Sequence, residues 1–121
     1  MRHRVKKTFD FNHKPGQHSR SVLRNLATSF FLHKSLVTTE KRAKALSILV
    51  DRMVRAANTA DSSMKAIRDA MAVLYTEVSS RELVERVAPK FKDRPSGCTR
   101  ITPIKYRDGD SAKLVKIEFV A

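Results

Sequence analysis

The chain has 121 residues, of which 41% are hydrophobic, and this is enough for one domain whose modest core needs no disulfide. Its 25 Lys and Arg residues outnumber its 12 Asp and Glu residues, and the net charge of +13 predicts a polyanionic partner, with nucleic acid as the first candidate. The single Cys98 excludes an internal disulfide, no stretch approaches the roughly 20 apolar residues of a membrane span, and we expect a cytoplasmic protein.

The first 18 residues are strongly basic and lack helical or alternating apolar periodicity, and Pro15-Gly16 interrupts them. We predict an extended arm at residues 1–18 that becomes ordered on its partner, followed by a single α+β domain at residues 19–121. The basic side chains would neutralise phosphates, and the histidines would stack on bases or contact phosphate. The candidate contacts in the arm are Arg2, His3, Arg4, Lys6, Lys7, His13, Lys14 and His18.

The segment after the arm has the apolar spacing of an amphipathic helix at about residues 19–34. Its predicted buried face consists of Leu23, Leu26, Ala27 and Phe30. Arg20, Arg24 and Thr28 recur at intervals of four on another face, which would continue the basic surface of the arm. A solvated charged face without a ligand is the alternative interpretation.

A short extended piece at residues 36–38 precedes a second helix. Thr39 offers a hydroxyl that can cap the helix, and Glu40 places a favourable charge at its start. The same turn holds three cations, which the helix dipole disfavours there, so we expect a compensating anion. These cations are Lys41, Arg42 and Lys44.

The body of this second helix shows a long apolar stripe. Asp51 and Arg55 are four residues apart and are predicted to pair on its exterior. The predicted buried residues are Ala43, Leu46, Val50, Met53, Val54 and Ala57.

Two further helices are predicted from the middle of the chain, and both are interpreted as structural. Asp61 is the expected cap of the first, and Ser79 with Glu82 fits a capping box that opens a short second one, which Pro89 helps to end. The predicted buried stripe of the first helix is Met64, Ile67, Met71, Leu74, Tyr75 and Val78.

The last third of the chain changes to the period of a strand. Apolar and charged residues alternate over residues 115–119, and residues 104–106 alternate likewise before a turn signal at residues 108–110, so we predict a β-hairpin. Pro103 places the first strand at an edge or a bulge. With residues 36–38 as a third strand, the expected fold is α+β, with helices packed on a small sheet of about three strands.

The stretch "DRPSGCTR" leads into the hairpin and carries a candidate phosphate site. Gly97 permits an unusual backbone angle, while Arg94, Thr99 and Arg100 offer donors suited to phosphate. An ordinary loop with incidental charge is the alternative.

Motifs for catalysis or metal binding are weak. His13 and His18 have a spacing seen in zinc sites, yet a structural site needs about four ligands and Cys98 has no CxxC partner. The chain contains no Walker loop, GxGxxG or GxSxG. We therefore expect no enzyme activity, no cofactor and no small-molecule substrate.

Five blocks of sequence occur in an order that resembles the bacterial large-subunit ribosomal protein L-seventeen family. This similarity implies a structural protein of the large ribosomal subunit that binds large ribosomal RNA near the nascent-chain exit and contacts neighbouring ribosomal proteins. It also implies a basic arm and an α+β body. The blocks are "MRHR", "LRNLATS", "TTEKRAKAL", "APKFKDRPSGCTRI" and "RDGDSAKLVKIEFV".

The resemblance also lends RNA-binding or supporting roles to individual positions. Family sequences usually have Arg where this chain has Ser19, and an aromatic ring where it has Cys98. The arm positions implied are Arg2, His3, Arg4 and His18, and the body positions implied are Arg24, Asn25, Thr38, Thr39, Arg94, Gly97, Thr99 and Arg100, to which the basic faces add Arg20, Lys41 and Lys44.

Two other classes of protein compete with this interpretation. A DNA-binding protein would also be basic and helical, but residues 36–38 read as extended and the turn lacks the glycine of many helix-turn-helix motifs. A peripheral membrane protein could use a basic amphipathic helix at residues 20–34 on anionic lipid. Our expected partner is RNA and not a membrane.

Removal of residues 1–18 should leave a domain that melts cooperatively, because the apolar stripes and the hairpin all lie beyond residue 18. RNA affinity should fall severely. Thermal unfolding and an RNA titration of the truncated chain measure both, and failure of the truncated chain to fold would mean that Phe9 and Phe11 belong to the core.

Overall fold

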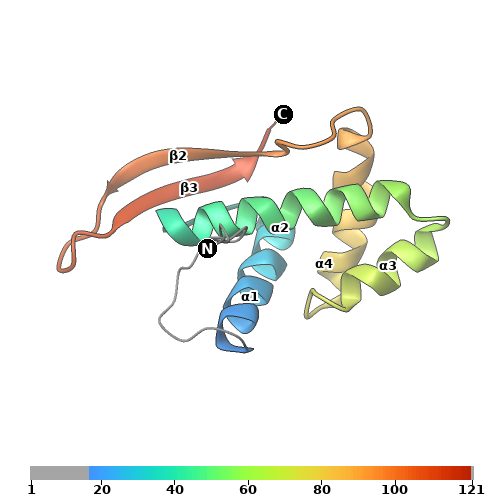
Figure 1. Cartoon of the computed structure of the whole chain (residues 1–121), viewed down its shortest axis with the longest axis horizontal. Coiled ribbons are helices and arrows are strands. Elements are labelled where there is room, and N and C mark those ends of the chain that lie inside the picture. Colours follow the sequence, from blue (N-terminus) through green and yellow to red (C-terminus); the bar gives the residue numbers. More distant parts are fainter. Residues whose placement is uncertain (1–16, 121) are drawn as a thin grey trace, which may run out of the picture.

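The computed structural model describes residues 17–120, which form an α+β fold, so the predictions for residues 1–16 lie outside the described part. The helices are α1 (Gln17–His33), α2 (Glu40–Thr59), α3 (Ser63–Met71) and α4 (Glu77–Glu82), and α4 continues through a π-helical turn η1 (Leu83–Val87) and a 3-10 turn η2 (Ala88–Phe91). The strands are β1 (Ser35–Thr39), β2 (Thr99–Tyr106) and β3 (Lys113–Phe119). In Figure 1, α2 crosses the molecule between the β2–β3 hairpin and the helices α1 and α3.

The three strands form one antiparallel sheet in the order β1-β3-β2, which confirms the predicted hairpin and third strand. Leu36 and Ile101 both lie opposite Ile117, so one face of the sheet carries apolar side chains towards the helices. The register shifts between Pro103 and Lys105 on the edge strand β2, as expected for a residue that cannot donate to the ladder. Tyr106 lies in the strand but is exposed.

Helix α2 fills the centre of the core with the stripe predicted for it. Its central residues Leu46 and Val50 are fully buried, and Ala57 at its end is partly buried. The helix contacts all three strands as well as α1, α3, η1 and η2. The sheet and the helices therefore meet through α2.

Four phenylalanines join α1, η2 and β3 beside α2. The ring centroid of Phe119 lies 4.4 Å from that of Phe30, 5.9 Å from that of Phe31 and 6.0 Å from that of Phe91. Such tilted contacts add to the free energy gained by burying the rings. The buried face predicted for α1 is confirmed at Ala27 and Phe30 and extends to Phe31.

Helix α3 differs from its predicted stripe. It ends at Met71 and packs on α2 through the small side chains of Ala66 and Ala70, while Met64 is 63% exposed and Met71 46% exposed. The Met spacing has helical period but marks the outer face, because the short alanines permit the closer approach to α2. The cap is Ser62, whose hydroxyl accepts the Lys65 amide at 3.2 Å, and not Asp61.

The helix predicted to open with a capping box at Ser79 begins three residues earlier. Thr76 is the N-cap of α4, and its hydroxyl accepts the amide of Ser79, which is itself fully buried. Pro89 does not end the helix. It lies at the start of η2 directly after the π-helical turn, a change of hydrogen-bond pattern that accommodates its missing N–H and its ring.

Leu74→Ala should destabilise the protein by about 2–5 kcal/mol, because Leu74 is only 2% exposed and its loss leaves a cavity. Met71→Ala should cost less than about 1 kcal/mol, since the Met71 side chain is half-exposed on the outer face of α3. Urea unfolding measures both. Equal losses of stability in the two variants would show that Met71 is buried, as the sequence predicted.

Candidate nucleic-acid interface

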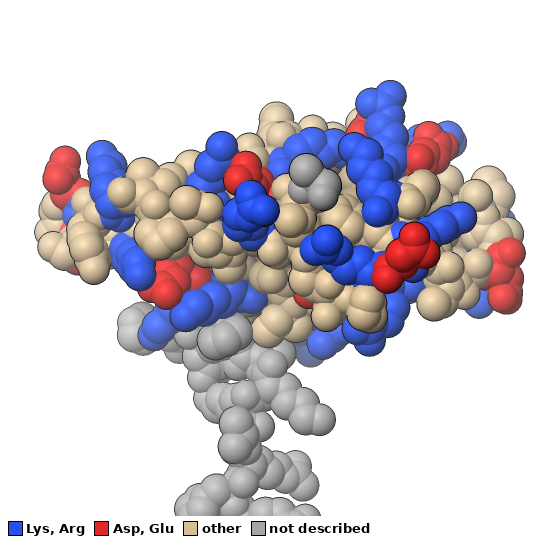
Figure 2. Space-filling view, turned by 90° about the horizontal axis from the view of Figure 1, so that it is seen from above, with Lys and Arg blue, Asp and Glu red and all other residues tan. Residues whose placement is uncertain are grey.

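Positive charge is unevenly distributed over the described residues. Residues 61–89, which include α3 and α4, carry 4 Lys and Arg against 5 Asp and Glu, whereas residues 17–60 and 90–120 together carry 16 against 6, a net charge of +10. Figure 2 shows one face of the molecule, along which Lys and Arg side chains are spread with acidic side chains between them. The basic surface therefore belongs to α1, α2 and the hairpin region.

The junction of β1 and α2 forms the first basic group. Thr39 has the backbone of an N-cap but its side chain makes no cap hydrogen bond, so the hydroxyl cap predicted there is wrong. Glu40 offsets part of this positive charge: its carboxylate lies 3.1 Å from Lys44 Nζ and 3.7 Å from Lys113 Nζ. The hydrogen bond from Lys44 and the charge of Lys113 lower the pKa of Glu40. Lys41 in the same turn is exposed.

Thr38 is buried on the helix side of the sheet opposite Val115, so it supports the junction from inside. The sheet brings Lys113 to this group, because Lys113 directly precedes Leu114, which lies opposite Thr39. Spacing along the chain could not predict this position.

The loop before β2 forms the second group. Gly97 has φ +72° with open space around it, so it is the backbone angle and not crowding that favours glycine here. Arg94 is exposed and its Nη1 donates to the Gly97 carbonyl at 3.3 Å. The Thr99 hydroxyl lies 2.8 Å from that of Ser47 on α2, so it is used within the fold. Arg100 is exposed on β2 opposite Glu118.

Helix α2 holds this loop through side chains that the sequence analysis interpreted differently. Asp51 accepts the Gly97 amide at 3.1 Å and the Cys98 amide at 3.0 Å. Arg55 Nη2 donates to the Pro95 carbonyl at 3.0 Å. Asp51 and Arg55, which were predicted to pair with each other on the exterior of α2, thus lie on the face of α2 that contacts the loop.

Cys98 is buried behind this loop. Burial, and then the negative charge of Asp51, raise the pKa of its thiol to about 11, so the thiol stays protonated at neutral pH. Within residues 17–120 no three His, Cys, Asp or Glu side chains are grouped so as to hold a metal ion. The zinc alternative involving His13 lies outside the described residues.

The third group lies on α1, and part of it is committed to the fold. Arg24 Nε donates to the Val73 carbonyl at 2.6 Å, and its guanidinium lies 4.4 Å from the ring centroid of Tyr75. Thr28 is buried and its hydroxyl accepts the Tyr75 amide at 3.1 Å. This face therefore packs on the turn between α3 and α4, and the basic exterior predicted for it is wrong at Arg24 and Thr28.

His18, Arg20 and Asn25 remain exposed on α1. In Figure 1, α1 and the loop before β2 lie on opposite sides of α2, so the structure does not bring the second and third groups together. The arm candidates Arg2, His3, Arg4, Lys6, Lys7, His13 and Lys14 lie outside the described residues.

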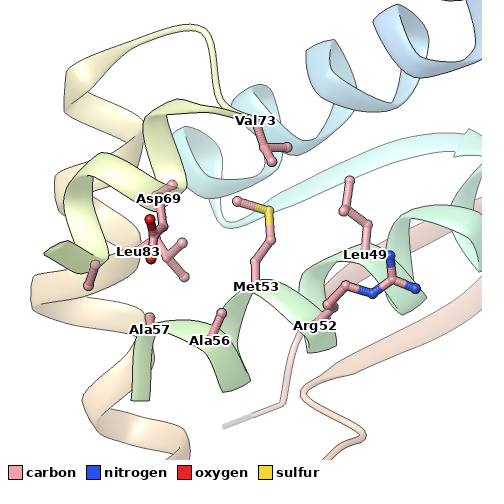
Figure 3. A pocket seen from close by; sticks show the side chains of 10 residues that line it. Leu49, Arg52, Met53, Ala56, Ala57, Asp69, Val73 and Leu83 are labelled. Carbon is pink, nitrogen blue, oxygen red and sulfur yellow. The ribbon is translucent and has the colours of Figure 1, made fainter. Parts of the chain in front are cut away.

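The structure also contains a cavity of about 230 Å³ between α2, α3 and η1 (Figure 3). Its lining is apolar apart from Arg52 and Asp69, whose side chains lie on α2 and α3. The cavity offers van der Waals contacts and lies on the nearly neutral side of the molecule.

In the described part of the chain, no helix is both long enough and apolar enough to span a membrane.

Comparison with known proteins identifies the family of this chain. The model of the ribosomal protein L17 family matches residues 22–120. The large ribosomal subunit protein bL17 of Desulforudis audaxviator is 38% identical over 103 residues, which are 85% of this chain and 90% of that protein. The bL17 proteins of Thermoanaerobacter sp. (38% over 88% of this chain and 94% of that protein) and Porphyromonas gingivalis (38% over 99% and 72%) are similar. The chain belongs to the ribosomal protein L17 family.

Glu40→Gln should lower stability at pH 7, because the Glu40 carboxylate then no longer attracts Lys44 and Lys113. Since the folded-state pKa of Glu40 is lowered, its contribution is present above the unfolded pKa near 4.5 and is lost as the pH falls through the folded value. Unfolding from pH 7 to pH 3 should therefore show the two proteins converging in acid. Asp69→Asn is the control, and a Glu40 difference that persists at pH 3 would contradict the ion-pair account.

Proposed function

We propose that the protein is a structural component of the large ribosomal subunit that binds large ribosomal RNA. Family membership supports the ribosomal role, since the similar proteins are named as large ribosomal subunit proteins. The observation that carries RNA binding is the separation of charge, with +10 over residues 17–60 and 90–120 and a nearly neutral α3–α4 side. Cations presented on one part of a surface bind phosphates by releasing condensed counterions.

The proposed RNA contacts are the exposed members of the three groups together with the arm. Arg20, Lys41, Arg94 and Arg100 carry charge at the surface, while Thr38, Thr99 and Arg24 support their surroundings from within. Phosphate contacts of this kind fix position, and the shape of the RNA supplies much of the specificity. The proposed role is in the assembly and architecture of the subunit and involves no catalysed reaction.

The position near the nascent-chain exit and contacts with neighbouring ribosomal proteins are part of the same proposal, and they rest on the family resemblance. Co-migration of the full chain with the large subunit through a high-salt gradient tests the ribosomal role. Preference for duplex DNA over structured RNA, or co-sedimentation with anionic vesicles in place of subunits, would favour the competing classes.

Replacing both Arg94 and Arg100 by Ala should lower affinity for a large-subunit ribosomal RNA transcript at least tenfold. Each charge-assisted contact is worth about 1.5–3 kcal/mol when well formed, and both side chains are exposed, so the melting temperature should stay nearly unchanged. Filter binding at several salt concentrations measures affinity. The wild-type slope of log affinity against log salt should be several units if roughly 6 phosphates are neutralised.

The matched control replaces Lys65 and Arg68 on α3 by Ala. It removes the same charge from the nearly neutral side and should change affinity by less than about threefold, as expected for charges distant from the phosphates. Equal losses in the two double variants would show a general effect of net charge and remove the loop from the site.

A further inference from the structure

The loop before β2 is fixed by helix α2 more than by its own residues. Both carboxylate oxygens of Asp51 accept consecutive backbone amides, at 3.1 Å from Gly97 and 3.0 Å from Cys98. One turn further along α2, Arg55 donates to the Pro95 carbonyl at 3.0 Å. The contacts therefore come from one rigid element and reach three of four successive loop residues.

An acidic side chain here is unfavourable for a phosphate site on electrostatic grounds alone. Asp51 lies next to the turn that carries Arg94, and its negative charge would repel a phosphate approaching that side chain. Its hydrogen bonds provide a different reason for its presence. Gly97 has φ +72°, and a carboxylate that binds its amide and the next one stabilises that turn.

Fixing the turn also fixes Arg94 relative to β2. Among residues 17–120, the Arg94 guanidinium uses one N–H on the Gly97 carbonyl, and the others of its five N–H donors are available to a ligand. Arg100 lies on β2, whose first residue Thr99 is bound to Ser47 of α2. Helix α2 thus determines the backbone positions from which the side chains of Arg94 and Arg100 extend.

We propose that Asp51 is a positioning residue for RNA binding, which holds the 94–98 loop so that Arg94 and Arg100 are presented to phosphate in a fixed arrangement. This inference rests on the proposed function of the loop. It assigns to Asp51 a favourable effect on binding to a polyanion, although its own charge opposes that binding. Preorganisation of this kind raises affinity by lowering the cost of ordering the loop on the RNA.

The opposed signs make Asp51→Asn decisive. Asn keeps the shape and one acceptor oxygen but replaces the other by an NH2 group, which cannot accept an amide. If positioning dominates, affinity for the ribosomal RNA transcript falls at least fivefold; if only charge matters, affinity rises. The control is Asp93→Asn, which removes an equal charge from an exposed residue that has no hydrogen bond or ion pair among residues 17–120, and it should leave affinity unchanged or slightly higher.

Three further measurements separate positioning from loss of fold. Asp51→Glu keeps the charge and both oxygens but moves them by one methylene, and it should also weaken binding. Asp51→Asn added to the Arg94→Ala and Arg100→Ala double variant should cause no further loss, because the residues that it positions are gone. Melting curves of every variant establish that the protein is folded at the assay temperature.

Unchanged or tighter binding by Asp51→Asn, with the arginine double variant weakened, would overturn the positioning role and leave the proposed function standing. An additional loss in the double-variant background would also overturn it, because Asp51 would then act without the arginines. If the arginine double variant itself binds normally, the loop is not an RNA contact and both proposals for it fail.

Discussion

Burial of one apolar stripe on α2 is the constraint on which the rest of the structure depends. The helix is 20 residues long, and its buried residues meet all three strands and most of the other helices. A hydrophobic stripe of this length cannot remain in water, so the sheet and α1 must both close on it. The phenylalanines beside it then hold α1, η2 and β3 together.

This single constraint also determines where charge can be displayed. The buried side of α2 takes the apolar residues, so its other sides carry Lys41 and Lys44 at the start and Asp51 and Arg55 in the middle. The first pair faces solvent, and the second pair holds the loop before β2. One helix therefore supports the core, a basic surface and the anchoring of a candidate contact loop.

Sequence periodicity predicted the elements whose pattern depends on a local period. The stripe of α2, the hairpin and the bulge near Pro103 were all confirmed, since each follows from spacing or from a missing amide. It was wrong on α3, because Met64 and Met71 have helical spacing yet lie outside, and small alanines form the contact. The candidate site was only partly predictable: basic residues are visible in a sequence, but the bonds of Asp51 to a loop 46 and 47 residues away depend on tertiary packing.

The strand order has a consequence for the timing of folding. The central strand of the sheet, β3, is the last of the three to be synthesised, and β1 pairs with it and not with β2. The first strand consequently has no partner until residues 113–119 have been made, and the apolar side of α2 lacks its cover from the sheet for the same period. Contacts of such long sequence separation slow folding and leave hydrophobic surface exposed meanwhile. The nascent protein thus cannot complete its sheet until residues 113–119 have been made.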